Sequence, residues 1–317
     1  MANGLYLSAL IPVYNEEENL VALGAEVSGA LGALGKPYEV ILVDDGSRDS
    51  SWTLIQDLVK KYPGFKGVRL GRNAGQTAAL LAGIQHAGGE LIVCLDADMQ
   101  NDARDVPKLL AKMNEGYDVV SGWRKDRQDR FLDRKLPSMI ANGLISRITG
   151  VNLHDYGCTL KLYKAEYLKP LRLYGEMHRF VPAFAGFLGA RIAEVPVNHR
   201  ARTAGVSKYG ITRTFKVLLD LMTVKFMDTY LGKPIYLFGG GGVGMGLLGV
   251  LFGAYTLYKK FYLGVFVKDQ PLFQVSIFCL LIGFQMVLLG LLAEILVRIY
   301  YDLKDMRPYF VRETAGL

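Results

Sequence analysis

Residues 91–100 read Leu-Ile-Val-Cys-Leu-Asp-Ala-Asp-Met-Gln, an apolar run that ends in two acidic residues one position apart. Side chains alternate between the faces of a strand, so Asp96 and Asp98 are predicted to point the same way. Gln100 joins them if the backbone stays extended. Three such oxygen-bearing side chains can hold a hard divalent cation that keeps phosphate oxygens and water as further ligands. This predicts a site for a nucleotide diphosphate, although acidic residues at strand ends also form ordinary turns.

The first 125 residues alternate short apolar runs with segments of helical length. We expect strands at residues 5–11, 39–43, 67–70, 91–95 and 118–121, and helices at residues 16–34, 50–62, 76–87 and 103–115. This alternation is typical of an α/β domain with a mainly parallel sheet, in which ligands bind beyond the carboxyl ends of the strands. Polar clusters follow three of these strands, at residues 12–17, 44–47 and 96–100. Their convergence predicts one crevice.

Two long stretches near the end of the chain carry no charged residue. They cover residues 234–258 and 270–293, which are 25 and 24 residues long. At about 1.5 Å per residue, each forms a helix long enough to cross a hydrocarbon core of about 30 Å. A buried core helix is the alternative, but uncharged runs of this length favour two membrane spans.

The charges around these stretches predict their orientation. Five basic residues precede the first run and four follow the second, against three lysines in the connecting loop: Lys208, Arg213, Lys216, Lys225 and Lys233; Arg298, Lys304, Arg307 and Arg312; Lys259, Lys260 and Lys268. The positive-inside rule therefore places both termini in the cytoplasm. No basic segment typical of a signal peptide opens the chain, which agrees with a cytosolic N-terminal domain. We expect a multi-pass protein of the plasma or inner membrane.

These patterns divide the chain into four predicted segments. They are a cytosolic α/β domain (residues 1–210), an interfacial amphipathic helix (211–232), a two-helix transmembrane anchor (233–300) and a cytosolic tail (301–317). Apolar residues recur at helical spacing in the second segment, beside lysines that could reach lipid headgroups, although an ordinary core helix has the same pattern. Small residues four positions apart in the first span favour close helix packing and could support a homo-oligomer.

Composition excludes several other classes. The net charge of +7 suits contact with anionic lipid, and no nucleic-acid recognition motif occurs. The three cysteines are scattered and predict neither a disulfide framework nor a metal cluster. A Gly-x-Gly-x-x-Gly pattern at residues 244–249 lies inside an uncharged run rather than between a strand and a helix, which excludes a Rossmann-type oxidoreductase.

Four motifs in order carry a resemblance to a known family. They are Ile11-Pro12-Val13-Tyr14-Asn15-Glu16, Val43-Asp44-Asp45-Gly46-Ser47, Arg72-Asn73-Ala74-Gly75 and Asp96-Ala97-Asp98-Met99-Gln100. Together they resemble the inverting family 2 glycosyltransferases with a GT-A fold. More narrowly, the chain is similar to the polyprenyl-phosphate hexosyltransferases, such as dolichol-phosphate mannose synthases and bacterial undecaprenyl-phosphate glucosyltransferases. The resemblance covers roughly residues 5–210, and the two spans match the bacterial architecture.

The resemblance implies roles for the residues of the predicted crevice. Pro12, Tyr14, Glu16, Asp44 and Gly75 would line the pocket of the nucleotide-sugar donor. Asp96 would contact the nucleotide ribose or a metal-bound water, and Asp98 and Gln100 would ligate Mg²⁺ or Mn²⁺. These expectations agree with the cation site that the strand pattern itself predicts.

Basic segments further along the chain resemble the family's acceptor site. Arg124, at the end of Ser121-Gly122-Trp123-Arg124, would hold the acceptor phosphate together with Arg134 and Ser138 of Arg134-Lys135-Leu136-Pro137-Ser138. Arg202, in Arg202-Thr203-Ala204-Gly205-Val206-Ser207-Lys208, resembles a third element near that phosphate. Guanidinium groups suit phosphate because they bind its oxygens bidentately, although a solvated basic face is the alternative.

Two other segments match the family less closely. The stretch from Asp155 to Lys161 departs from the family pattern, since Thr159 replaces a glycine and Lys161 an arginine, so we do not carry over the details of the family's acceptor site to this stretch. The segment His178-Arg179-Phe180 either borders the sugar or starts a helix.

The predicted reaction is inverting hexosyl transfer from a nucleotide sugar to a polyprenyl phosphate at the cytosolic membrane face. UDP-glucose with undecaprenyl phosphate is the first expectation, because of the two spans, and GDP-mannose with dolichyl phosphate is the second. A non-catalytic nucleotide-binding membrane scaffold is a third interpretation, which the intact Asp96, Asp98 and Gln100 disfavour. A processive polysaccharide synthase is disfavoured because the chain lacks a Gln-x-x-Arg-Trp element and further spans.

Overall fold

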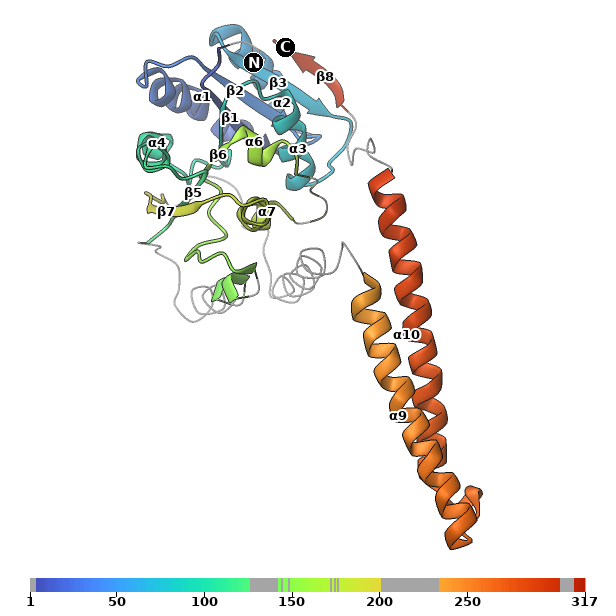
Figure 1. Cartoon of the computed structure of the whole chain (residues 1–317). Coiled ribbons are helices and arrows are strands. Elements are labelled where there is room, and N and C mark those ends of the chain that lie inside the picture. Colours follow the sequence, from blue (N-terminus) through green and yellow to red (C-terminus); the bar gives the residue numbers. More distant parts are fainter. Residues whose placement is uncertain are drawn as a thin grey trace. The chain divides into compact units, whose positions relative to one another are not determined.

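The computed structural model describes residues 4–125, 142–143, 145–147, 149–171, 173, 175, 177–200, 234–302 and 311–316. The chain forms two compact units. One comprises Met1–Leu221 with Arg307–Leu317, and the other comprises Met222–Met306. Figure 1 shows the first unit as an α/β domain and the second as a helical hairpin. The predicted interfacial helix at residues 211–232 lies outside the described residues.

The α/β domain contains every strand and helix that the sequence predicts for residues 1–125, with ends that differ by a few residues. In order they are β1 (Leu7–Val13), α1 (Glu17–Gly32), β2 (Tyr38–Asp44), α2 (Ser51–Lys61), β3 (Phe65–Leu70), α3 (Gln76–His86), β4 (Leu91–Cys94), η1 (Ala103–Asp105), α4 (Val106–Asn114) and β5 (Val119–Trp123). The elements that follow are β6 (Lys161–Lys164), α6 (Ala165–Leu168), η3 (Met177–Phe180), α7 (Val181–Phe187) and β7 (Ile192–Pro196).

Within the described residues, the sheet has eight strands in the order β7-β5-β6-β4-β1-β2-β3-β8. The pairs β1–β2, β1–β4, β2–β3 and β5–β7 are parallel, whereas β6 runs antiparallel to β4 and β5. This confirms the predicted mainly parallel α/β fold. Because helices cover both faces of the central strands, β1 and β2 read as nearly continuous apolar runs.

Alternate residues of β1 pack into two different layers. Leu7, Ala9, Ile11 and Val13 join the core beneath α1, α2 and α4. Leu10 points to the other face, where a Cβ at Gly83 of α3 would lie only 3.3 Å from the Leu10 side chain. Helix α3 therefore packs directly on β1, which brings the amino end of α3 to the carboxyl ends of the strands.

The eighth strand comes from the far end of the chain. Strand β8 (Val311–Ala315) pairs antiparallel with β3 and forms one edge of the sheet, as Figure 1 shows. These residues fall in the segment that we expected to be a cytosolic tail, so part of that tail belongs to the α/β domain. A polar five-residue strand has no strong pattern of its own, and only its pairing with β3 reveals it.

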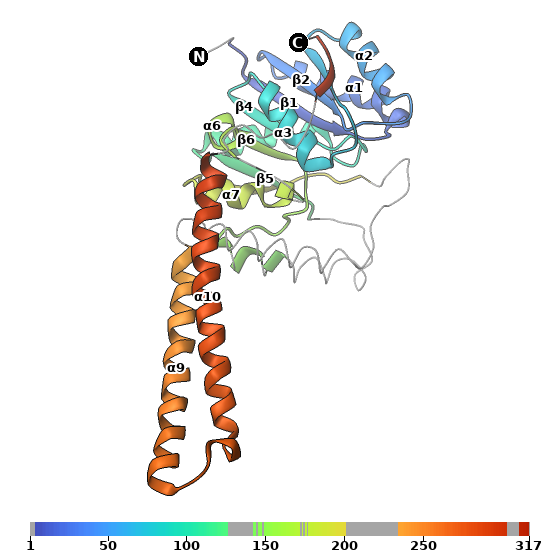
Figure 2. The ribbon, with the colours of Figure 1, turned by 90° about the vertical axis from the view of Figure 1, so that its right-hand side faces the viewer.

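The second unit is a hairpin of two long helices, α9 (Pro234–Leu263) and α10 (Pro271–Asp302), joined through η4 (Val267–Asp269). Both are long and apolar enough to cross a membrane, and they lie side by side in Figures 1 and 2. Many of their leucine, valine and phenylalanine side chains are exposed, as lipid-facing residues are. This agrees with the two predicted spans.

Glycines bring the two helices into backbone contact. A Cβ at Gly242 of α9 would lie 2.6 Å from the carbonyl oxygen of Gly283 in α10. The Ser276 hydroxyl donates a hydrogen bond of 2.8 Å to the carbonyl of Gly249. Small residues allow this approach, and dispersion contacts then hold the hairpin together in lipid.

We predict that Gly242→Leu destabilises the hairpin, because the new side chain must displace the α10 backbone, at a cost of about 1–3 kcal/mol or more. The control is Gly244→Leu on the same helix, where an added Cβ would meet nothing within 4 Å. Thermal unfolding of the full chain in detergent should show a lower Tm for the first variant only. Equal Tm values for the two variants would contradict the close packing.

Candidate functional site

Hydrogen bonds join the loops at the carboxyl ends of β1 and β2. The backbone N–H of Asn15 donates to the Ser47 hydroxyl at 2.9 Å, and the side-chain oxygen of Asn15 accepts from the Arg48 N–H at 2.9 Å. The N–H of Glu16 donates to the Ser51 hydroxyl at 3.0 Å. Asn15 has a positive φ of 52°, a conformation that asparagine tolerates better than most residues. These bonds set one wall of the predicted crevice.

Asp45 ties the next loop to the same wall. Its carboxylate accepts hydrogen bonds from the N–H groups of Ala74 at 2.7 Å and Gly75 at 3.0 Å. Gly75 has a φ of 93° and precedes the first turn of α3. Burial raises the pKa of Asp45, and the neighbouring Asp44 adds to that rise, although the two N–H groups act against it. A buried carboxylate thus orients the start of α3.

The first residue of α3 connects this loop to the end of β4. The Gln76 amide donates a hydrogen bond of 3.1 Å to Oδ1 of Asp96. Both residues are half-buried. The predicted convergence of the strand ends therefore exists as a chain of contacts from Asn15 through Ser47 and Asp45 to Asp96.

Asp96 and Asp98 lie close enough to affect each other. Burial raises the pKa of Asp96 to about 6, and the negative charge of Asp98 contributes to the rise. Asp98 Oδ1 accepts a hydrogen bond of 3.2 Å from the Gln100 N–H, and Met99 between them has a positive φ of 60°. The backbone therefore turns at Met99 and does not stay extended, which was the condition under which Gln100 was expected to point the same way as Asp96 and Asp98.

A divalent cation fits this group of side chains. Burial, and then the charge of Asp98, disfavour the charged form of Asp96, and a nearby cation would favour it. Within the described parts of the chain, no three His, Cys, Asp or Glu side chains form a possible metal site. A cation here would therefore depend on Asp96, Asp98 and Gln100 together with ligand or water oxygens, as Mg²⁺ commonly does in phosphate sites.

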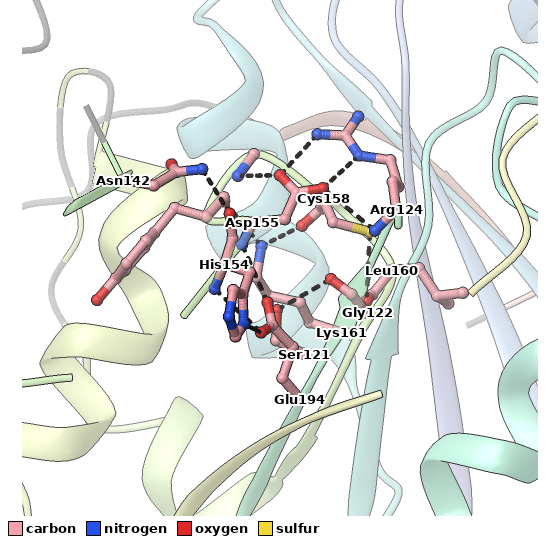
Figure 3. A network of polar contacts seen from close by, with 12 residues as sticks. Ser121, Gly122, Arg124, Asn142, His154, Asp155, Cys158, Leu160, Lys161 and Glu194 are labelled. Atoms are coloured by element: carbon pink, nitrogen blue, oxygen red, sulfur yellow. Dashed lines mark hydrogen bonds and ion pairs between the residues drawn. The ribbon is translucent and has the colours of Figure 1, made fainter. Parts of the chain in front are cut away.

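A buried ion pair lies beyond β5. The Arg124 guanidinium donates to Asp155 through Nε at 2.6 Å and through Nη2 at 2.9 Å, and Figure 3 shows the two side chains face to face. Burial alone would lower the pKa of Arg124, but the Asp155 carboxylate reverses this and raises it. Two of the guanidinium donors are therefore occupied at the residue that we predicted to bind the acceptor phosphate.

The segment around Asp155 is fixed from several sides. The Glu194 carboxylate accepts hydrogen bonds from the N–H groups of His154 and Asp155, each at 3.0 Å. The ammonium of Lys161 is buried and donates to the carbonyls of Tyr156 and Cys158, as Figure 3 shows in part. Burial lowers the pKa of Lys161. Lys161 thus supports the loop that carries Asp155.

The segment that leads towards residue 201 is attached to the Asp96–Gln100 loop. The Arg200 N–H donates to the Gln100 carbonyl at 3.0 Å, and its guanidinium pairs with Asp102 and Glu26, each at 2.7 Å. Although burial alone would raise the pKa of Asp102, Arg104 and Arg200 lower it to about 2. The loop with the predicted cation ligands is therefore held by Gln76 at Asp96 and by Arg200 at Gln100.

The structure describes some of the predicted site residues and not others, and the described ones differ in burial. Four of them are half-buried: Pro12 near the end of β1, and Tyr14, Glu16 and Gly75 in the connected loops. The side chain of Asp44 has no exposed surface, and its Oδ1 accepts the Ser47 N–H at 2.9 Å. Three predicted acceptor-site residues lie outside the described residues: Arg134, Ser138 and Arg202. Their roles, like those of the other site residues, stay predictions.

Sequence reasoning assigned none of the contacts below, although it had included Asp45 in a polar cluster and His178 in a segment that could border the sugar. Asp45 holds α3, Gln76 contacts Asp96, and the Thr77 hydroxyl lies 2.9 Å from Nδ1 of His178. The last contact brings η3 to the amino end of α3. Helix α3 starts directly after Gly75, in the loop that follows β3. The first polar residues of such a helix are expected to face the site, and this pattern could have identified Gln76 and Thr77 from the sequence.

Comparison with known proteins identifies the family. Residues 8–172 match the sequence family "Glycosyl transferase family 2". The chain belongs to this family. Its likeness to two curated relatives extends beyond the family segment and includes the helical hairpin, so the resemblance read from the four motifs is confirmed.

The first of these relatives is the dodecaprenyl-phosphate galacturonate synthase of Rhizobium johnstonii, 45% identical over 98% of this chain and 93% of that protein. The undecaprenyl-phosphate 4-deoxy-4-formamido-L-arabinose transferase of Shewanella sediminis is 38% identical over 97% of this chain and 92% of that protein. Neither name contains glucose, the sugar that we expected first.

Solved structures support the GT-A fold. The glucosyl-3-phosphoglycerate synthase of Mycobacterium tuberculosis, in complex with Mn²⁺, UDP and phosphoglyceric acid, aligns with a TM-score of 0.55 and 17% identity over 71% of this chain and 78% of that one. The mannosyl-3-phosphoglycerate synthase of Rubrobacter xylanophilus also gives a TM-score of 0.55, with 13% identity over 71% of this chain and 75% of that one.

We predict that Arg124→Gln lowers the stability of this glycosyltransferase by about 3 kcal/mol or more, because it removes the positive charge that compensates the buried Asp155 carboxylate. The Tm should fall by roughly 6–12 °C, measured by thermal unfolding of the full chain in detergent. The control is Lys125→Gln, which removes an adjacent, exposed charge. An unchanged Tm for Arg124→Gln would mean that the guanidinium does not stabilise this loop.

Proposed function

We propose that this glycosyltransferase transfers a sugar, with inversion, from a nucleotide sugar to a polyprenyl phosphate at the cytosolic membrane surface. The observation that carries the proposal is the set of hydrogen-bonded loops at the ends of β1–β4, which includes Asp96, in a chain with two helices long and apolar enough to cross a membrane. The 45% identity to a dodecaprenyl-phosphate galacturonate synthase over 98% of the chain supports this choice of acceptor.

The donor would bind with its nucleotide against the β1 and β2 loops, near Pro12, Tyr14 and Glu16, and its diphosphate towards Asp98 and Gln100. A bound Mg²⁺ or Mn²⁺ held by Asp98 and Gln100 would neutralise charge on the leaving diphosphate. The hydrogen bond from Gln76 would keep the Asp96 carboxylate oriented towards the donor. Preorganised polar groups of this kind stabilise charge without rearrangement during the reaction.

The acceptor explains why no strong general base is required. A phosphate monoester has a second pKa of about 6, so its attacking oxygen is largely anionic at neutral pH. The task of the protein is to bring two anionic reactants together in line. Arg134, Ser138 and Arg202 are the proposed acceptor ligands, with Arg124 contributing the donors that Asp155 leaves free. The attachment of Arg200 to the Gln100 carbonyl at 3.0 Å supports an acceptor segment close to the donor site.

Galacturonate replaces glucose as the first candidate sugar in this proposal. The reason is that the 45% identical relative is named as a galacturonate synthase. The two predicted spans, on which the expectation of glucose was based, are a weaker argument. The second candidate is 4-deoxy-4-formamido-L-arabinose, the sugar named for the 38% identical transferase. UDP is the proposed nucleotide carrier.

The proposed topology follows from β8. This strand comes after both helices of the hairpin and is part of the sheet. If both helices span the membrane, the domain and β8 are on the same side, and the distribution of lysine and arginine favours the cytoplasm.

A panel of labelled nucleotide sugars tests the function. Membranes containing the full chain are incubated with UDP-galacturonate, UDP-4-deoxy-4-formamido-L-arabinose, UDP-glucose or GDP-mannose, and with undecaprenyl phosphate. We expect label in the lipid extract with UDP-galacturonate and little with the others. Transfer from another sugar in the panel would correct the sugar alone. No lipid-linked product, combined with transfer to a soluble acceptor, would refute the polyprenyl-phosphate assignment.

We also predict that Asp98→Asn reduces the transfer rate at least 100-fold, a loss of about 2.7 kcal/mol in transition-state stabilisation. Chelation of divalent cations should stop transfer by the wild type, and added Mg²⁺ or Mn²⁺ should restore it. Asp57→Asn, at a side chain that is 61% exposed on α2, is the matched control. A metal-independent wild type with an active Asp98→Asn variant would rule out the cation site.

A further inference from the structure

Strand β8 contributes a charged residue to a row that crosses three strands. The sheet register pairs Asp44 of β2 with Arg69 of β3, and Arg69 with Glu313 of β8. Directly paired residues share one face of a sheet and interact most strongly across strands. The row therefore alternates acid, base and acid, and its inner end is Asp44, beside the donor loops.

The side chains in this row make contact. Nε of Arg69 lies 3.2 Å from Oδ2 of Asp44, and its Nη1 lies 3.9 Å from Oε1 of Glu313. The Trp52 indole N–H of α2 donates a hydrogen bond of 2.9 Å to the other oxygen of Glu313. The Arg69 guanidinium lies 5.6 Å from the centre of the Trp52 ring. Trp52 and Glu313 thus confine Arg69 from two sides.

Asp44 depends on the charge of Arg69. The Asp44 side chain is fully buried, and among the described residues none donates a hydrogen bond to its Oδ2. A buried carboxylate without a compensating charge is strongly disfavoured. Arg69 is 25% exposed, so without Glu313 its long side chain can turn towards solvent and leave Asp44 uncompensated.

Asp44 in turn supports the donor loops. Its Oδ1 accepts the Ser47 N–H at 2.9 Å, and the Ser47 hydroxyl accepts the Asn15 N–H at 2.9 Å. Gly46 lies between Asp44 and Ser47 in the sequence and has a φ of 68°. A Cβ on Gly46 would lie 2.5 Å from the Arg72 backbone. The loop has little room for another conformation, so a shift of Asp44 passes directly to Ser47 and to the β1 loop.

We propose that Arg69 is a positioning residue for the nucleotide-sugar donor and that Glu313 of β8 holds it in place. The strand that follows the membrane hairpin thereby completes the donor site. This inference rests on the proposed function, because it assumes that the β1 and β2 loops bind the donor nucleotide.

Kinetics of the full chain test the proposal, with the donor that the wild type uses and with undecaprenyl phosphate. Glu313→Gln should raise the KM for the donor about five- to tenfold, the scale expected for a lost charged contact, with little change in kcat or in the KM for the acceptor. The control is Thr314→Val, which keeps a β-branched side chain at the next position of β8 and should leave the donor KM unchanged.

A double variant separates positioning from general damage to the strand. Arg69→Gln should raise the donor KM at least as much as Glu313→Gln does. Adding Glu313→Gln to Arg69→Gln should have no further effect, since residues that act through one contact are not additive. An unchanged donor KM for Glu313→Gln, an equal rise in Thr314→Val, or full additivity in the double variant would each overturn the proposal.

Calorimetric titration with UDP distinguishes a failure of this inference from a failure of the proposed function. Wild-type transfer with unaltered UDP affinity in Glu313→Gln would refute the role of β8 alone. Absence of both UDP binding and sugar transfer in the wild type would refute the proposed function and this inference together.

Discussion

Hydrogen bonds from side chains to loop backbone are the interactions on which the site depends. Parallel strands that end together leave loops with unpaired N–H groups, and these groups need partners when they are partly buried. Asp45 accepts from Ala74 and Gly75, and Ser47 accepts from Asn15. Because each bond joins loops from different strands, no single loop can move without breaking a contact to its neighbour. These bonds therefore hold the loops at the strand ends in one arrangement.

Buried charges impose a second constraint around the same crevice. Arg124 pairs with Asp155, Arg69 with Asp44, and Arg200 with Asp102. Each carboxylate is almost completely buried, so separating a pair would leave a charge without compensation. These pairs lie beyond β5, on the neighbouring strands β2 and β3, and beside the Asp96–Gln100 loop. They lie around a proposed site whose reactants are both anionic.

Local patterns explain why so much of the fold could be predicted. Apolar runs and the polar breaks between them locate strands β1 to β5 and helices α1 to α4 in the sequence. Both signals are local. The position of Asp96 and Asp98 at the strand ends was predictable because an acidic pair follows an apolar strand, and the cation that we expect there stays a prediction. Strands β6 and β7 and the edge strand β8 were not predicted, since their residues become strands only by pairing with partners far away in the chain. For β8, those partners are more than 240 positions distant.

The amino-acid sequence alone determined the alternating α/β domain, the acidic pair at the end of β4 and the two apolar helices, because hydrophobic period and uncharged length act locally. Only the tertiary structure decided which side chains meet. It brought Gln76 to Asp96, Asp155 to Arg124, and Glu313 to Arg69 across the sheet. Such contacts depend on strand order and register, which arise from the packing of the whole domain and have no signature in any one segment.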